Sequence, residues 1–299
     1  MKRIEALVGR KVELIGAASG LGAPDSSVSV APAYLQAYRL DDVLAARGVQ
    51  ARWSRLLAPR IVSPRPQAIT EFNHRLSNRV GSALRRGNFP LVLGGDHSIA
   101  AGTWRGAAEH VRSRDSGALG LLWVDAHMDA HTPASSPSGN FHGMPLASLL
   151  GADGSQPALD PTHVALVGVR SFESAEAELL RRLGVRVYFI DEVQTRGPAA
   201  VFEEALAIVT AGTARFGVTI DIDALDPRDA PGTGLPVDDG LRSGDLIPAL
   251  ATVAAMPGFS AAEIVEFNPF RDRDGTTRRL VETIAATLLE PLRVPAGVS

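Results

Sequence analysis

Short apolar runs alternate with longer amphipathic stretches along this chain. A short continuous apolar run is typical of a strand that is buried on both faces, and apolar residues three and four positions apart indicate a helix that covers such a strand. The alternation therefore predicts an α/β fold with a mostly parallel sheet that helices cover on both faces. The predicted strands are residues 12–15, 91–93, 119–124, 164–167, 185–190, 216–220 and 263–265.

Helical stretches and segments rich in proline and glycine separate these strands. The proline and glycine clusters predict long loops that carry function. The sequence has no internal repeat and no low-complexity linker, so we expect residues 1–299 to form a single domain. The predicted helices include residues 67–86, 175–183 and 199–211, and the predicted loops are residues 16–32, 132–143 and 227–244.

The composition excludes several classes of protein and of site. The net charge of −3 provides no basic surface for nucleic acid. The chain has no cysteine, which excludes thiolate chemistry and is typical of a reducing compartment such as the cytoplasm. Its two lysines, Lys2 and Lys11, lie near the N-terminus, so no lysine is available for Schiff-base chemistry in the core. No apolar run is long enough to span a membrane, and Lys11 and Glu13 interrupt the early apolar stretch that a signal peptide would need.

Acidic residues and histidines lie at or just beyond the ends of four of the predicted strands. In an open α/β sheet, ligands bind beyond the carboxyl ends of the strands, and parallel neighbours would bring these residues to one edge. The residues concerned are His97 after 91–93; Asp125, His127 and Asp129 after 119–124; Asp221 and Asp223 after 216–220; and Glu266 after 263–265.

The spacing within these clusters suits a metal site. Asp125, His127 and Asp129 alternate with other residues, so an extended backbone would place their side chains on one face. Aspartate and neutral histidine are good ligands for hard to borderline divalent metals. An alternative for each cluster is that its aspartate only caps the helix that follows. The occurrence of three such clusters favours the metal site. The histidines support it too, because four of the seven fall between positions 97 and 142, namely His97, His127, His131 and His142.

Several longer motifs resemble those of the ureohydrolases, the family that includes arginase, agmatinase and related amidino hydrolases. They are Gly-Gly-Asp-His-Ser at 94–98, Asp-Ala-His-Met-Asp at 125–129, Ser-Gly-Asn-Phe-His-Gly-Met-Pro at 138–145 and Asp-Ile-Asp-Ala-Leu-Asp-Pro at 221–227. Pro-Gly-Thr-Gly at 231–234 and Glu-Phe-Asn-Pro at 266–269 continue the match in the same order. The ordered set is specific to this family, and it is closest to arginase.

The resemblance implies a three-layer α/β/α sandwich with a centre of two Mn²⁺ ions. A hydroxide that bridges the ions would attack the guanidinium carbon of L-arginine, and urea and ornithine would be released. The ligands implied for one ion are His97, Asp125, Asp129 and Asp221. The ligands implied for the other are Asp125, His127, Asp221 and Asp223, so that Asp125 and Asp221 would bridge.

The resemblance also implies roles for residues around the metals. His142 matches the family's proton-transfer histidine, and Glu266 matches the acid that receives the guanidinium. Asp129 would pass on the proton of the hydroxide. The family commonly forms trimers or hexamers, so we expect a homo-oligomer. Contacts to the amino-acid end of the substrate are implied for Ser138, Asn140 and Glu173.

Two departures from the arginase motifs leave the substrate open. His131 stands where most arginases have asparagine, and Leu235 stands where the family usually has threonine. Leu235 removes a hydroxyl near the amino and carboxylate groups of arginine, whereas the His131 imidazole could donate to a carboxylate. Agmatine or a guanidino acid is therefore the alternative substrate.

Two further interpretations have a different function. A one-metal amidohydrolase of the deacetylase type would lack a full second ligand set, which His97 and Asp129 supply here. A catalytically inactive regulatory homologue would have lost a metal ligand, and no ligand position is altered in this sequence.

Overall fold

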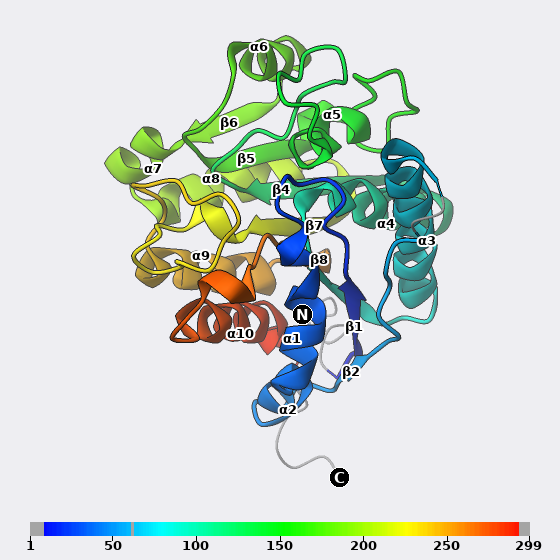
Figure 1. Cartoon of the computed structure of the whole chain (residues 1–299), viewed down its shortest axis with the longest axis vertical. Coiled ribbons are helices and arrows are strands. Elements are labelled where there is room, and N and C mark those ends of the chain that lie inside the picture. The colour runs from blue at the N-terminus through cyan, green and yellow to red at the C-terminus, as the bar shows by residue number, and fades with distance from the viewer. Residues whose placement is uncertain (1–8, 61–62, 293–299) are drawn as a thin grey trace.

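The computed structural model describes residues 9–60 and 63–292, and at its centre is a sheet of eight strands (Figure 1). The strand order is β2-β1-β3-β8-β7-β4-β5-β6, and all neighbouring strands are parallel. The predicted parallel α/β fold is thereby confirmed. The strands are β1 (Val12–Ala17), β2 (Ala51–Trp53), β3 (Phe89–Gly94), β4 (Ala118–Val124), β5 (Val164–Val169), β6 (Arg186–Phe189), β7 (Thr213–Asp221) and β8 (Phe259–Val265).

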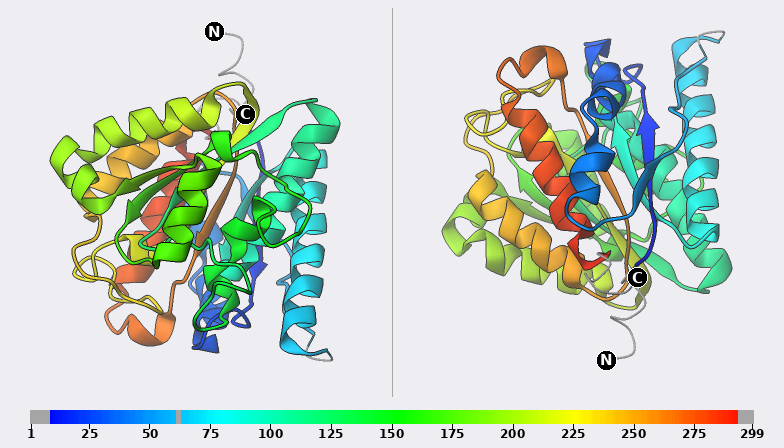
Figure 2. Two further views of the ribbon diagram at one scale, coloured as in Figure 1. Left: turned by 90° about the horizontal axis from the view of Figure 1, so that it is seen from above. Right: turned by 90° about the horizontal axis from the view of Figure 1, so that it is seen from below.

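Helices cover both faces of the sheet and produce three layers (Figure 2). Along β4, Leu122 and Val124 pack on one face while Leu121 and Trp123 pack on the other, because successive side chains of a strand point to opposite sides. The first face is covered by α1 (Ala31–Ala37), α2 (Leu40–Ala45), α7 (Ile190–Arg196), α8 (Pro198–Thr210), α9 (Ser243–Ala255) and α10 (Thr276–Leu289). The second face is covered by α3 (Arg65–Arg85), α4 (Ala100–Arg114), α5 (Pro145–Leu149) and α6 (Ser174–Leu183).

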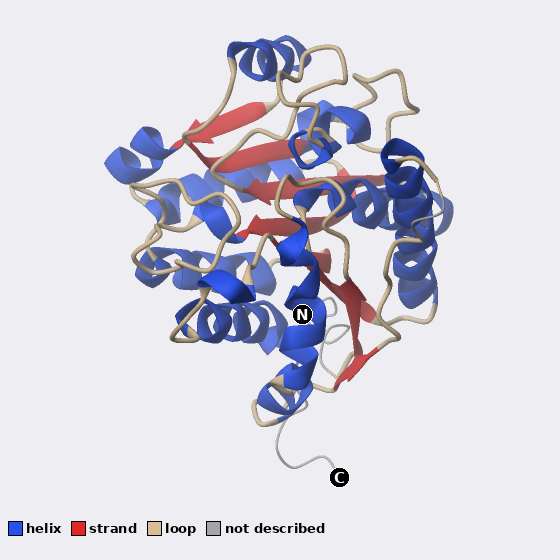
Figure 3. Cartoon of the chain, in the orientation of Figure 1, coloured by secondary structure: helices blue, strands red, loops and turns tan. Residues whose placement is uncertain are grey.

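Strands, helices and loops alternate clearly in Figure 3, and the loops also contain short 3-10 helices. No helix of the described residues is long and apolar enough to cross a membrane. The 3-10 helices are η1 (Ser26–Val30), η2 (His97–Ile99), η3 (Phe141–Gly143), η4 (Pro161–His163), η5 (Ile222–Ala224), η6 (Pro269–Arg271) and η7 (Glu290–Leu292).

The predicted elements differ from the structure at both ends of the sheet. Each predicted strand overlaps an observed one, and the three predicted helices correspond to α3, α6 and α8. β2 does not follow from the pattern, because Ala-Arg-Trp is a three-residue, partly exposed strand at the edge of the sheet. The strand predicted at 185–190 is too long, because β6 ends at Phe189 and the apolar Ile190 begins α7.

The order of the strands positions the functional loops. β3, β8, β7 and β4 are consecutive in the sheet, and all four point the same way. Their carboxyl ends therefore lie side by side, which is where open α/β sheets bind ligands. The loops that begin near His97, Glu266, Asp221 and Asp125 meet at this edge, although they are distant in the sequence.

Close packing between the sheet and its helices depends on glycine in two strands. A Cβ atom at Gly120 of β4 would lie 1.8 Å from the backbone oxygen of Val209 in α8. A Cβ atom at Gly217 of β7 would lie 2.2 Å from the ring of Trp104 in α4. Any larger residue must push the helix away, because protein interiors are close-packed.

Gly120→Ala should therefore destabilise the protein. The added methyl group meets backbone rather than a movable side chain, and overpacking of this kind costs about 1–3 kcal/mol. Urea denaturation should show a lower midpoint with an unchanged slope. Gly244→Ala is the matched control, because a Cβ atom there meets nothing within 4 Å. Equal midpoints for the two variants would contradict the packing argument.

Candidate metal centre and active site

His97 lies at the centre of three buried carboxylates. Its Nδ1 atom is 3.1 Å from Oδ2 of Asp125, 2.9 Å from Oδ2 of Asp129 and 3.2 Å from Oδ2 of Asp221. Despite these short distances, Nδ1 has no hydrogen-bond partner of suitable geometry among the described residues. The histidine nitrogen and one oxygen each of Asp125 and Asp129 lie within 4.8 Å of one another, and Asp221 adds a third carboxylate near the same nitrogen. This donor set fits a divalent cation.

A second group shares Asp125 with the first. Nδ1 of His127 is 3.2 Å from Oδ2 of Asp223 and 3.5 Å from Oδ1 of Asp125. These atoms could hold a second cation, with Asp125 between the two positions. Asp221 directs Oδ2 at His97, whereas its Oδ1 accepts a hydrogen bond from the backbone of Asp223. A bridging role for Asp221 stays a prediction.

Local hydrogen bonds aim these carboxylates. Oδ1 of Asp125 accepts from the backbone nitrogen of His127 at 2.7 Å, and Oδ1 of Asp221 accepts from that of Asp223 at 2.8 Å. The expected extended segment with alternating side chains is therefore wrong, and each aspartate does cap the turn that follows its strand. Capping and metal binding are compatible, because each carboxylate caps with Oδ1 and presents Oδ2 to His97.

Two predicted site residues have a left-handed backbone. Asp129 has a φ of 50° and Glu266 a φ of 61°, and both are among five such non-glycine residues in the described chain. Conformations of this kind cost about 1–3 kcal/mol and persist where the surroundings impose them, often at functional sites. Hydrogen bonds hold both turns, because Asp129 accepts from the backbone of Leu146 and Glu266 donates to the backbone of Gly95.

A buried hydrogen-bond chain holds the ring of His97. Its Nε2 atom is 3.0 Å from Oγ1 of Thr219, which donates to Oε1 of Glu263 at 3.0 Å. Because the only hydroxyl proton of Thr219 goes to Glu263, Nε2 must carry the proton that Thr219 accepts. In the neutral ring, Nδ1 then directs its lone pair at the carboxylates. A partner on the second nitrogen is typical of metal-binding histidines.

The charges at this edge of the sheet are unbalanced. Burial and Asp125 raise the pKa of Asp129, and burial together with Asp223 and Asp125 raises the pKa of Asp221 well above its usual range. Burial opposes ionisation of His97, yet the surrounding carboxylates raise its pKa well above the usual value. Carboxylates that repel one another where water is excluded are strongly stabilised by a cation. The electrostatics of the site therefore agrees with metal binding.

His142 and Glu266 lie together beside the first group. Nδ1 of His142 is 3.4 Å from Oε1 of Glu266, and the same oxygen accepts from the backbone nitrogen of His97 at 2.9 Å. Glu266 is buried, whereas His142 is half-buried. Burial lowers the pKa of His142, but the Glu266 carboxylate outweighs it and raises that pKa above the usual value. An imidazole in this position can move a proton between a buried group and solvent.

His131 forms a third group with two glutamates. Its Nε2 atom is 3.0 Å from Oε2 of Glu173 and 3.2 Å from Oε2 of Glu176, and its Nδ1 atom is 3.1 Å from Oγ of Ser135. Both ring nitrogens have partners, so donation to a substrate carboxylate would require one of these contacts to break. Burial raises the pKa of Glu176 to about 8. The group thus contains a buried imidazole, the buried Glu176 and the exposed Glu173.

The other predicted substrate contacts lie in loops. Ser138 is exposed, and its Oγ accepts from the backbone nitrogen of Asn140 at 3.2 Å. Leu235 is 40% exposed, and it follows Gly234, at which a Cβ atom would lie 3.2 Å from Oε2 of Glu266. Leu235 is therefore close in the chain to the buried acid. Substrate contacts of Ser138, Asn140 and Leu235 stay predictions.

Several residues that organise the site are absent from the sequence-based predictions. Arg170 donates to the carbonyl oxygens of Asp223 at 2.7 Å and Val237 at 2.8 Å, and so joins the loop after β7 to the predicted loop 227–244. Thr219 and Glu263 are polar residues inside buried strands, which is the signal that could have revealed them. Glu176 lies three residues after Glu173 in a capping box, a pattern that is visible in the sequence.

Comparison with known proteins agrees with this geometry. The model of the Arginase family matches residues 10–290. The arginase of Bacillus caldovelox is 40% identical over 230 residues, which are 74% of this chain and 75% of that protein. This chain belongs to the arginase family. It is therefore a hydrolase of the ureohydrolase type, and the deacetylase-type alternative no longer applies.

Solved arginases have the same fold. The arginase from Bacillus cereus has a TM-score of 0.86 and 31% identity, over 94% of this chain and 98% of that chain. The arginase of Entamoeba histolytica in complex with L-ornithine has a TM-score of 0.86 and 25% identity, over 95% of this chain and 99% of that chain. These likenesses confirm the arginase-like three-layer fold that the motifs predict.

Thr219→Val should weaken metal binding without changing the ligands. The substitution keeps the shape of the side chain but removes the hydroxyl that joins His97 to Glu263. Loss of such a supporting partner typically costs about 10–100-fold in metal affinity. The measurement is calorimetric titration of the metal-free protein with Mn²⁺. Thr210→Val is the matched control, because that hydroxyl donates within α8 to Leu206. Equal affinities for the two variants would remove Thr219 from the support of the centre.

Proposed function

We propose that this protein is a dinuclear manganese hydrolase that cleaves the guanidino group of L-arginine to urea and ornithine. The observation that carries the proposal is the pair of groups around His97 and His127, which share the buried Asp125 at the edge of a parallel sheet. Membership of the arginase family supports the same chemistry, because the relative from Bacillus caldovelox is an arginase.

Two overlapping sets of side chains would hold the cations. Four aspartates would balance the four charges of two divalent ions, and imidazole and carboxylate ligands suit manganese. Two divalent cations held here would lower the pKa of a coordinated water molecule and so supply a nucleophile at neutral pH. The first set is His97, Asp125, Asp129 and Asp221. The second set is Asp125, His127, Asp221 and Asp223.

Glu266 would receive the guanidinium group. Its carboxylate is buried, with Oε1 near the backbone of His97 and Oε2 near Gly234. A carboxylate accepts the N–H groups of a guanidinium in charge-assisted hydrogen bonds, which are stronger where water is excluded. A guanidinium group held by Glu266 would have its carbon directed toward the edge of the sheet where the proposed metal ligands lie.

Asp129 and His142 would move the protons of the reaction. Burial and the neighbouring Asp125 raise the pKa of Asp129, so it accepts a proton more readily than an exposed aspartate. The amine that leaves must gain a proton as its bond to carbon breaks. His142 can donate that proton from its half-buried position and recover one from solvent, because imidazole titrates near neutral pH.

The group around His131 favours a substrate that has a second cationic nitrogen. Glu173 and Glu176 attract an ammonium group and repel the carboxylate of a guanidino acid that lacks one. Arginine and agmatine both have this nitrogen, and only arginine adds a carboxylate, which Ser138 and Asn140 would recognise. Agmatine is the second candidate, because His131 already uses both ring nitrogens.

Three parts of the proposal go beyond the chemistry of the site. Manganese as the metal and a trimeric or hexameric assembly follow from the family resemblance. A cytoplasmic location is also proposed, and the absence of cysteine in the sequence agrees with a reducing compartment.

Removal of metal should abolish urea release. Chelation should inactivate the protein, and Mn²⁺ should restore activity better than Mg²⁺, because imidazole ligands suit manganese better than magnesium. Colorimetric measurement of urea gives the activity, and metal analysis gives the stoichiometry. We expect two ions per active chain, so a fully active chain with a single ion would contradict a dinuclear centre.

His142→Ala and Asp223→Ala should lose activity for different reasons. His142→Ala removes a proton donor, so kcat should fall about a hundredfold to ten-thousandfold while metal content stays intact. Asp223→Ala removes a ligand, so metal content should fall first. Both quantities are measured on the same preparations. Loss of a metal ion from the His142 variant would reverse our assignment of roles.

The preference among guanidino substrates tests the site for the amino-acid end. We expect kcat/KM to decrease from arginine to agmatine, and to be lowest for 4-guanidinobutyrate, which lacks the ammonium group that Glu173 and Glu176 attract. Steady-state kinetics with the three compounds gives the order. A preference for arginine over agmatine below about tenfold, roughly 1.4 kcal/mol, would mean that no working carboxylate site exists.

A further inference from the structure

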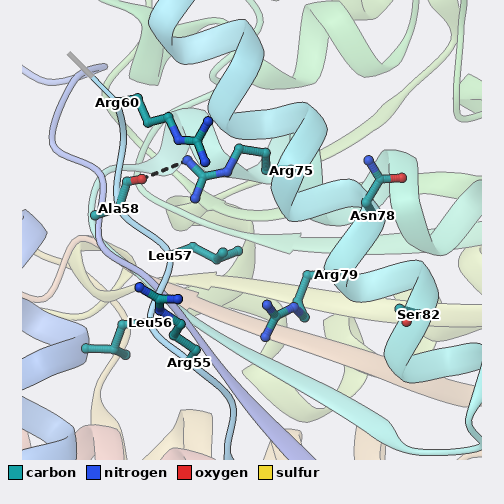
Figure 4. A pocket seen from close by; sticks show the side chains of 9 residues that line it. All are labelled: Arg55, Leu56, Leu57, Ala58, Arg60, Arg75, Asn78, Arg79 and Ser82. Carbon is teal, nitrogen blue, oxygen red and sulfur yellow. Dashed lines mark hydrogen bonds between the residues drawn. The ribbon is translucent and has the colours of Figure 1, made fainter. Parts of the chain in front are cut away.

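A pocket lined by four arginines lies between α3 and the loop that follows β2 (Figure 4). Arg55 and Arg60 come from the loop, and Arg75 and Arg79 come from successive turns of α3. Leu57 is buried and contributes an apolar part of the lining. The pocket has a volume of about 580 Å³, which is in the range of small-molecule sites. None of its lining residues belongs to the metal centre.

The four guanidinium groups have no acidic partner. Within residues 9–60 and 63–292, the side chains of Arg55, Arg60 and Arg79 form no hydrogen bond or ion pair, and that of Arg75 donates only to the carbonyl oxygen of Ala58, at 2.9 Å. No aspartate or glutamate is among the described lining residues. Like charges gathered in this way repel one another, and nothing in the described pocket compensates them.

The nearby acid Glu71 does not compensate these four arginines through an ion pair. Glu71 lies one turn before Arg75 on α3, but it accepts a hydrogen bond from Ser63 at 3.1 Å and forms no ion pair with the four arginines. Some arginines elsewhere pair with acids, as Arg242 does with Asp229 at 2.7 Å, and others, such as Arg47 and Arg112, are exposed and unpaired, but this pocket brings four arginines to one concavity. In a chain with a net charge of −3, unpaired arginines around one concavity indicate a site for an anion.

We propose that this pocket binds a small molecule through a phosphate group. A guanidinium presents its N–H donors in a planar fork that matches phosphate oxygens two at a time, and a phosphate dianion can engage several guanidinium groups at once. The loop pair and the helix pair line the pocket from its two sides (Figure 4). The space beyond the phosphate group and the apolar Leu57 would accommodate the rest of the molecule.

Calorimetric titration of the Mn²⁺-loaded full chain with inorganic phosphate tests this proposal. The Arg55→Gln/Arg79→Gln variant removes two guanidinium groups that form no bond in the described structure, so the fold should not depend on them. We expect its Kd for phosphate to rise more than about tenfold, because hydrogen bonds to charged groups contribute strongly. Arg47→Gln/Arg112→Gln is the matched control, since it removes the same charge from exposed, unpaired positions and should leave Kd unchanged.

A parallel titration with succinate separates phosphate from carboxylate as the recognised group. Tighter binding of succinate than of phosphate would overturn the assignment of a phosphate ligand. The site itself would be refuted by a wild-type chain that binds neither anion, or by equal phosphate affinity in the two double variants. Sedimentation analysis adds a further test. A change of oligomeric mass in Arg55→Gln/Arg79→Gln alone would make the pocket a contact between copies of the chain and overturn the proposal.

Discussion

Repulsion among buried carboxylates is the interaction on which the rest of the site depends. Asp125, Asp129 and Asp221 each direct an oxygen to within 3.2 Å of one histidine nitrogen, in a place from which water is largely excluded. Such an arrangement is unfavourable unless a positive charge occupies it, because the interior does not screen like charges as water does. The site therefore favours the binding of cations, and the rest of the protein must hold the carboxylates in place against their mutual repulsion.

Hydrogen bonds from the backbone and from residues of the strands hold these carboxylates in place. Hydrogen bonds from backbone nitrogens engage one oxygen of Asp125 and one of Asp221, and left-handed turns fix Asp129 and Glu266. Behind these residues, the hydroxyl of Thr219 donates a hydrogen bond to Glu263 and contacts Nε2 of His97. Thr219 and Glu263 lie in the buried strands β7 and β8, so the ring of His97 is supported from the packed interior of the sheet. Rigid placement keeps the carboxylates from relaxing apart.

Charge is also distributed unevenly outside the centre. The carboxylates of Glu173 and Glu176 surround His131, whereas unpaired arginines line the pocket between α3 and the loop after β2. The first region attracts cations and the second attracts anions, even though the chain is almost neutral as a whole. Two ligands of opposite charge could therefore occupy this molecule at separate places without competing.

The sequence by itself determined the class of fold and the candidate ligand residues. Apolar runs that end in aspartate or histidine identify both buried strands and their functional ends, because strand burial and ligand placement are local properties of short segments. The ordered motifs also identified the family. Only the tertiary structure decided how those residues are aimed. An extended segment was the natural expectation for Asp125 and Asp129, but a local cap at Asp125 and a left-handed turn at Asp129 replace it, and the distant Leu146 donates to the backbone of Asp129. Glu263, Arg170 and the arginine pocket depend on side chains far apart in the sequence, and no local pattern specifies such contacts.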